Sequence, residues 1–171
     1  MDVKIIINLL CSACLAYLGY SLAMKKFKLE RRHNMLVKRY EEAYYPFLLS
    51  LFRGFNIEAP PKKLDFDTAV YYLDMLSQNL HLWNEQVVRL YPEYYRLYLD
   101  LQESHFNNPK QEAKHAREIA LVFADICLLI LEESTTIAKE ISLPPISQVL
   151  LSNYCQTNQH ILQHHQRIEK Q

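Results

Sequence analysis

The feature that most constrains this chain is an uncharged stretch near its N-terminus. Residues 5–24, IIINLLCSACLAYLGYSLAM, contain no Asp, Glu, Lys or Arg. At 1.5 Å per residue, a helix of this length extends about 30 Å, the thickness of the hydrocarbon core of a bilayer. Only Asn8 and two serines interrupt the apolar run, whereas a core helix of a water-soluble protein usually has a polar face. The stretch predicts a transmembrane helix.

The charges beside this stretch predict its orientation. Basic side chains follow it directly, and an excess of Lys and Arg marks the cytoplasmic side of a span. We therefore expect the N-terminus outside the cytoplasm and the C-terminal domain inside. The same cations are expected to contact lipid headgroups, each contributing about 1 kcal/mol near an anionic surface. They are Lys25, Lys26, Lys28, Arg31 and Arg32.

The N-terminal stretch has two other interpretations, a cleaved secretory peptide and a lipid attachment site. A cleaved secretory peptide has its positive charge before the apolar run, and here the cluster follows it. Lipid attachment at Cys14 would make the chain an extracytoplasmic lipoprotein, because CSAC differs by one residue from the Leu-Ser-Ala-Cys pattern of such proteins. Against this, Cys11 stands in place of the leucine, and the sequence after Cys14 stays apolar. We expect both cysteines to act as small apolar side chains.

Small side chains recur on one face of the predicted span. Their spacings of four, three and four residues place them on a single side of a helix, where they would let a second helix approach closely. This pattern predicts self-association and a possible homodimer through the membrane helix. The residues are Ser12, Ala16, Gly19 and Ala23.

The rest of the chain has the pattern of an all-α protein. The whole chain contains only two glycines, whereas sheets with tight hairpins need glycine for positive φ angles. Apolar residues recur at spacings of three and four, and no alternating strand pattern competes with them. We expect an N-terminal single transmembrane helix followed by a cytosolic antiparallel bundle of four or five helices. The predicted parts are a membrane anchor at 1–24, a basic and amphipathic helix at 25–57, and a helical bundle with a polar C-terminal tail at 58–171.

Capping residues predict where several helices begin and end. Gly54 should end the helix that follows the anchor, and Pro46 should kink or restart that helix. Asp65 or Asp67 should begin a second helix, and Asn84 a short turn before a helix with Pro92 in its first turn. Asn108 and Pro109 should begin the central core helix, which the LPP motif at 143–145 stops.

Candidate chemistry is sparse in this sequence. Asp125 lies within the most apolar helix, so we expect a polar core position where the carboxylate pairs with a tyrosine or with Arg89 or Arg96. His160 and His164 are one turn apart, and His165 follows His164, but two ligands do not make a metal site. The sequence contains no phosphate loop, zinc-protease motif or dinucleotide motif. We therefore predict no cofactor, no metal and no catalytic residues.

The charge balance bears on the partners. Nineteen basic residues match nineteen acidic residues, and carboxylates stand beside the tyrosine-rich segments, so the chain has no nucleic-acid footprint. Membrane lipid and another protein are the expected partners. The sequence therefore favours a membrane-anchored interaction or regulatory module. The alternatives are a membrane-bound enzyme using Asp125 or the tail histidines, and the lipoprotein on Cys14.

Overall fold

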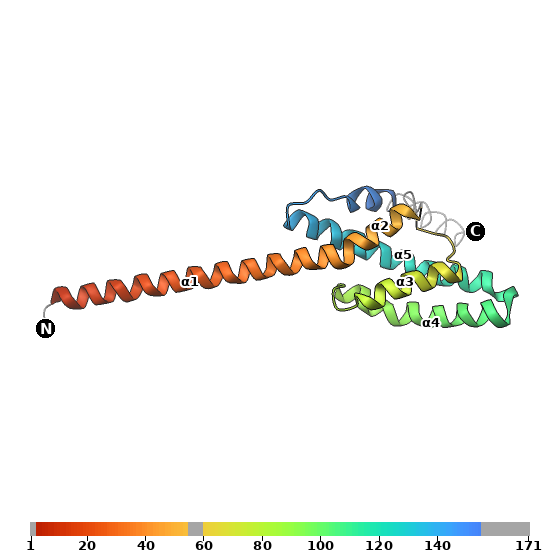
Figure 1. Cartoon of the computed structure of the whole chain (residues 1–171), viewed down its shortest axis with the longest axis horizontal. Helices are drawn as coiled ribbons and strands as arrows, with labels where there is room; N and C mark the ends of the chain where they lie inside the picture. The colour runs from red at the N-terminus through yellow and green to blue at the C-terminus, as the bar shows by residue number, and fades with distance from the viewer. Residues whose placement is uncertain (1–2, 55–59, 155–171) are drawn as a thin grey trace, which may run out of the picture. The chain divides into compact units, whose positions relative to one another are not determined.

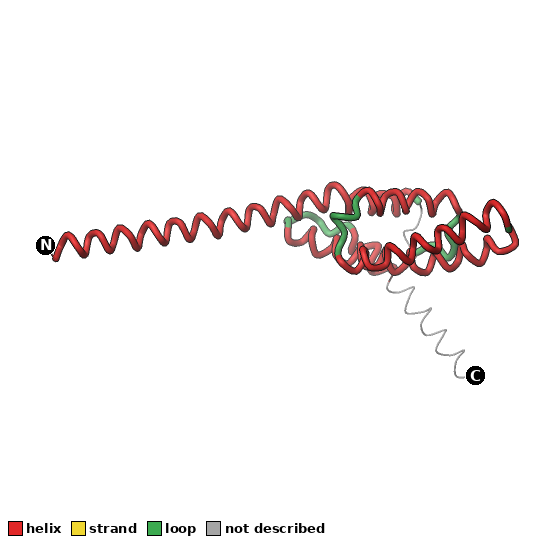
Figure 2. Tube along the Cα trace, turned by 90° about the horizontal axis from the view of Figure 1, so that it is seen from below, coloured by secondary structure: helices red, strands yellow, loops and turns green. Residues whose placement is uncertain are grey.

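The structure is a computed structural model that describes the backbone of residues 3–54 and 60–154, and the side chains of residues 14–54 and 60–154. All regular secondary structure in these residues is helical, which confirms the predicted all-α class (Figures 1 and 2). The contacts divide the chain into two units, Met1–Lys38 and Arg39–Gln171.

Helix α1, Val3–Arg39, makes up the described part of the first unit. Its last residue, Arg39, belongs to the second unit. Nearly every side chain that is described in this unit is exposed, including those of Leu15, Leu18 and Leu22. No helix in the described part of the chain is both long and apolar enough to cross a membrane. Residues 1–13, which form the first part of the predicted span, lie outside the described side chains. The transmembrane helix therefore stays a prediction.

The helical backbone is irregular directly after α1, close to Pro46, where the sequence predicts a kink or a restart. A π-helical turn, Tyr40–Tyr44, precedes helix α2, Tyr45–Arg53, with Pro46 in its first turn. The N–H of Tyr45 donates to the carbonyl of Tyr40, the wider bonding step of a π turn. Proline has no N–H to donate, so the turn lies where the regular hydrogen-bond ladder cannot continue. Gly54 ends α2, as predicted.

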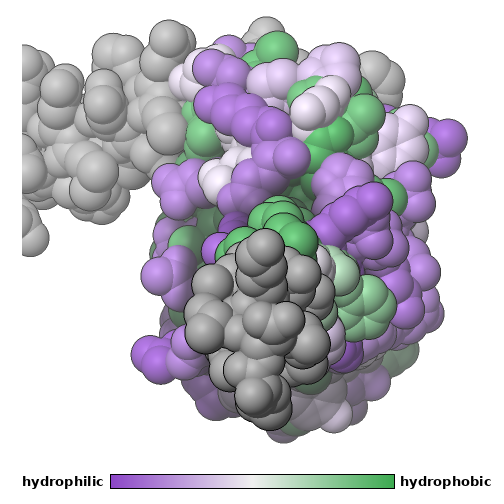
Figure 3. All heavy atoms as spheres, turned by 90° about the vertical axis from the view of Figure 1, so that its left-hand side faces the viewer, coloured by the Kyte–Doolittle hydropathy of each residue, from purple (hydrophilic) through white to green (hydrophobic). Residues whose placement is uncertain are grey.

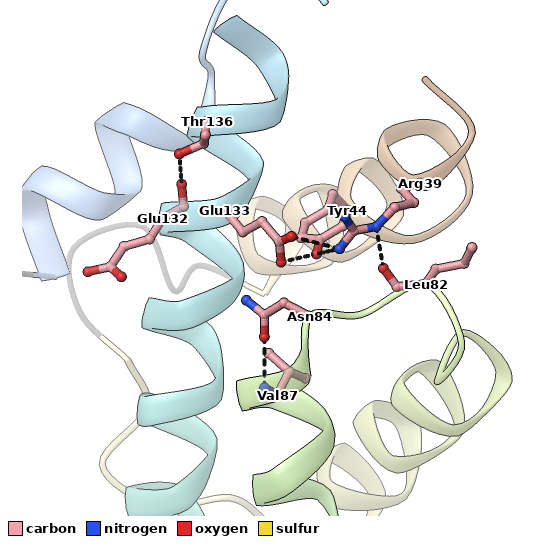
Figure 4. Close-up of polar contacts among 8 residues, drawn as sticks. All are labelled: Arg39, Tyr44, Leu82, Asn84, Val87, Glu132, Glu133 and Thr136. Atoms are coloured by element: carbon pink, nitrogen blue, oxygen red, sulfur yellow. Dashed lines mark hydrogen bonds and ion pairs between the residues drawn. The ribbon is translucent and has the colours of Figure 1, made fainter. Parts of the chain in front are cut away.

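The caps predicted for the next helices are present. Helix α3, Phe66–Gln78, begins at Asp65, whose carboxylate accepts a 2.8 Å hydrogen bond from the N–H of Thr68. Helix α4, Glu85–Asn107, begins at Asn84, whose side chain accepts a 2.8 Å bond from the N–H of Val87 (Figure 4). The expected short turn before a separate helix at Pro92 is wrong, because Pro92 lies inside a continuous α4.

The central helix is α5, Pro109–Glu140, which begins after Asn108 as predicted, although the Asn108 side chain forms no capping hydrogen bond. Its C-terminus closes with the two backbone bonds of a Schellman motif: Leu143 N–H donates to the Ala138 carbonyl, and Ser142 N–H to the Lys139 carbonyl. Ser142 has a φ of 60°, a conformation in which glycine is the usual residue. Residues 147–154 are again helical.

Aromatic rings fill the core between these helices. In Figure 1, α3, α4 and α5 lie side by side, and the helices pair along the chain, α3 with α4 and α4 with α5. Phe123 of α5 contacts Phe47, Tyr72 and Tyr94, with ring centroids 6.2, 4.3 and 6.1 Å apart. The Nε1–H of buried Trp83 donates to the Leu76 carbonyl at 3.0 Å. The face of the molecule in Figure 3 is mostly hydrophilic, with hydrophobic atoms gathered in smaller patches.

Candidate functional site

The residues predicted to act at the membrane lie on α1. Ala16, Gly19 and Ala23 are exposed, and the side chain of Ser12 lies outside those described. A Cβ atom built on Gly19 would meet nothing within 4 Å, so the chain leaves this face open at that position.

The predicted basic cluster is exposed on α1 as well. Lys26 pairs with Glu30 one turn further on, at 3.7 Å, and the side chains of both residues are largely exposed. The cluster thus presents its charge to the surroundings of the helix, as a contact with lipid headgroups requires. Its five members, Lys25, Lys26, Lys28, Arg31 and Arg32, are all in the exposed class.

The prediction of a polar core position at Asp125 is wrong. Asp125 is exposed, as is Leu121 one turn earlier, so this side of α5 faces solvent although its sequence is apolar. Arg89 and Arg96 pair instead with Glu85 and Asp100 of their own helix, at 2.6 and 3.3 Å.

The environment of Asp125 still perturbs its ionisation. Partial desolvation, together with the negative charge of Glu93 on α4, raises the pKa of Asp125 above its ordinary value. This perturbation comes from packing and from one neighbouring carboxylate, which is a weak signal for catalysis.

Only some of the residues that could bind a metal are described in the structure. The tail histidines His160, His164 and His165 lie outside the described residues. Within the part of the chain that is described, no three His, Cys, Asp or Glu side chains are grouped so that they could hold a metal. Cys14 is exposed, whereas Cys127 is buried, and burial raises the pKa of its thiol.

A cavity of about 570 Å³ lies at the end of α2 and the start of α3. Arg53 and Lys63 contribute two positive charges to its lining, and Asp65 and Asp67 contribute two negative charges. Asp65 already caps α3, so the N-terminus of that helix has its own carboxylate. Balanced charges of this kind favour no single class of ligand.

A polar cluster joins the end of α1 to α5 within the second unit (Figure 4). Arg39 donates through Nε to the Leu82 carbonyl at 2.7 Å, and through Nη2 to Glu133 Oε1 at 2.7 Å and to the Tyr44 hydroxyl at 2.9 Å. The Tyr44 hydroxyl donates in turn to Glu133 Oε2. The Arg39 and Glu133 side chains are only 22% and 20% exposed.

The polar cluster was not anticipated from the sequence. Burial and the hydrogen bond to Glu133 raise the pKa of Tyr44, so its hydroxyl stays protonated and available as a donor. Both carboxylate oxygens of Glu133, the Tyr44 hydroxyl, and Nε and Nη2 of Arg39 have partners within the protein, which is typical of a structural ion pair. Arg39 and Glu133 are 94 residues apart in sequence, so no local motif could have indicated the cluster.

Comparisons with protein-family models, curated proteins and solved structures find no match to this chain. The fold defines an all-α helical protein.

Proposed function

We propose that this chain is a single-pass membrane protein whose helical domain binds another protein at the cytoplasmic face, with the N-terminus outside and no catalytic activity. The observation that carries the proposal is the uncharged run at 5–24, followed by a cluster of Lys and Arg. Such a run is long enough to span, and such a cluster stays on the cytoplasmic side.

The exposure of α1 supports the anchor. Leu15, Leu18 and Leu22 are 69%, 56% and 66% exposed. Apolar side chains at this level of exposure are unfavourable in water, and a bilayer would cover them. The open face at Gly19 supports close approach of a second α1 and therefore a homodimer within the membrane.

Exposed apolar side chains on the second unit support the interaction role. Tyr95 and Leu99, which are one turn apart on α4, are 45% and 43% exposed. Exposed apolar side chains that lie together mark interaction sites, and aromatic side chains are enriched in protein interfaces. The binding partner is therefore expected to be a protein.

Membrane association is tested by sedimentation of the full-length protein. We expect it in the membrane pellet after alkaline carbonate extraction, and we expect Leu15→Lys with Leu18→Lys to release it, because each charge at the centre of a span costs about 2.5–3.5 kcal/mol. As a control, Leu143→Lys should leave the protein in the pellet. Wild-type protein in the supernatant would refute the anchor, and digestion of the C-terminal domain by protease added to intact cells would refute the orientation.

A further inference from the structure

Helix α4 carries a row of exposed apolar side chains on one face. Val88, Tyr95, Leu99 and Phe106 are 36%, 45%, 43% and 66% exposed, and they are separated by seven, four and seven residues. This spacing places all four on one side of a helix, over about 27 Å at 1.5 Å per residue. We call these four residues the α4 stripe. It is distinct from the core face of the same helix, where Tyr94 and Leu101 are fully buried.

Neighbouring tyrosines hold the middle of the α4 stripe in place. The Tyr95 ring lies 6.4 Å from that of Tyr91 and 6.2 Å from that of Tyr98, centroid to centroid. Tyr98 in turn stacks on Phe66 of α3 at 5.9 Å. Rings that are positioned in advance lose little side-chain entropy on binding, and tyrosine is among the residues that contribute most to protein interfaces. The α4 stripe therefore has the composition of a docking surface.

The charges of helices α3 and α4 are predominantly negative. Arg89 and Arg96 are the only Lys or Arg residues of α3 and α4, and they pair with Glu85 and Asp100 of their own helix. The remaining acidic residues of the two helices are Asp67, Asp74, Glu93 and Glu103.

Glu103 is an exposed carboxylate on the same side of α4 as the stripe. It lies one turn after Leu99 and one turn before Phe106, so it shares their side of the helix surface. A partner bound on the α4 stripe would meet a carboxylate at its edge.

We propose that the α4 stripe is the docking surface for a helix of a partner protein that presents an apolar face flanked by Lys and Arg. The apolar face would cover the stripe, and the flanking cations would meet the carboxylates of α3 and α4. Charge complementarity of this kind selects the partner and speeds its association, while the buried aromatic and aliphatic side chains provide affinity. Two copies of α4 would bring like charges together, so a basic partner fits better than self-pairing. This inference rests on the proposed function of the chain as an interaction module.

The probe for this surface is a fluorescein-labelled amphipathic helix of leucine and lysine with about five turns, the length of the stripe. Its binding to full-length protein in phosphatidylcholine nanodiscs is measured by fluorescence anisotropy, with protein-free nanodiscs giving the contribution of lipid. We expect the double variant Tyr95→Ala with Leu99→Ala to weaken binding at least about tenfold, because it removes two central anchors. A second peptide with glutamate in place of lysine should bind more weakly than the first.

The matched control is the double variant Tyr45→Ala with Leu143→Ala. These two side chains are 46% and 44% exposed, nearly the same as Tyr95 and Leu99, but they lie on other elements. We expect this variant to bind the lysine peptide like the wild type. Equal losses in both double variants, no wild-type binding above that of empty nanodiscs, or equal binding of the glutamate peptide would each overturn the proposal.

A further variant separates loss of the surface from loss of the fold. Glu103→Lys changes an exposed side chain at the edge of the α4 stripe, so we expect an unchanged melting temperature and weaker binding of the lysine peptide. Unchanged binding by this variant would contradict the charge argument. Sedimentation of the same proteins with membranes tests the anchor independently, so a failed docking surface and a failed anchor give different results.

Discussion

Glu133→Ala tests whether the polar cluster at Arg39 stabilises the helical domain. The substitution removes the acceptor of two hydrogen bonds, one from Arg39 Nη2 and one from the Tyr44 hydroxyl. The Arg39 guanidinium keeps two acceptors in this variant, the Leu82 carbonyl and the Tyr44 hydroxyl oxygen. The Tyr44 side chain is fully buried, and its hydroxyl would lose its only acceptor among the described residues.

The size of the effect follows from burial. Removing one partner of a fully buried ion pair costs about 3–5 kcal/mol, and the corresponding value for an exposed pair is at most about 1 kcal/mol. The Arg39 and Glu133 side chains are about one-fifth exposed, so this ion pair is closer to a buried pair than to an exposed one. Because Arg39 keeps two acceptors, we expect a loss of about 2–4 kcal/mol, on the low side of the fully buried range.

The assay is thermal unfolding of the full-length protein in a mild detergent, followed by circular dichroism. For a chain of this size, a loss of about 2–4 kcal/mol lowers the melting temperature by about 4–16 °C. The control is Glu132→Ala on the adjacent exposed residue of the same helix, which should change stability by less than about 0.5 kcal/mol. Equal melting temperatures for the two variants would refute the conclusion that the cluster stabilises the fold.

Three further predictions test the membrane helix, a helix end and a buried tyrosine. Gly19→Leu should lower the crosslinking yield of dimers without unfolding the chain, because a Cβ at that position meets nothing within the chain. Ser142→Gly should raise the free energy of unfolding by about 0.5 kcal/mol, because φ is positive at this position. Ser152→Gly, inside a helix, should lower the free energy of unfolding. Changes of the same sign for the two variants in chemical denaturation would contradict this prediction. Burial raises the pKa of Tyr94 above its ordinary value of 10.0, so stability should be complete below pH 10 and fall as the pH rises further, with Tyr94→Phe showing a smaller fall.

Local signals predicted the helix ends well. Asp65 and Asn84 cap α3 and α4, because a cap requires only one polar side chain within one turn of the backbone it serves. Asn108 precedes α5 without a side-chain cap bond. Pro92 shows the limit of such signals. Proline is common in a first turn, but packing of Val87, Tyr94 and Leu101 against the core continues α4 through it.

Positions that depend on packing between distant segments could not be predicted. Asp125 was expected in the core because α5 is apolar nearly all round, yet Leu121 on the same side is also exposed. Hydropathy along one helix gives the composition of its faces, but which face is covered depends on the neighbouring helices. The Glu93 carboxylate beside Asp125 comes from such a neighbour.

The π turn and the polar cluster occur together for a physical reason. A π turn adds one residue to a helical turn and so rotates the residues after it relative to those before. In this protein the turn begins directly after Arg39 and contains Tyr44, two residues that must both reach Glu133. Pro46 removes the hydrogen bond that would keep the helix regular at this point, which lowers the energy needed to form the wider turn. The sequence predicts an irregular helix at Pro46. It does not predict that Arg39 and Tyr44 bind one carboxylate, because that carboxylate belongs to Glu133 of α5, far along the chain.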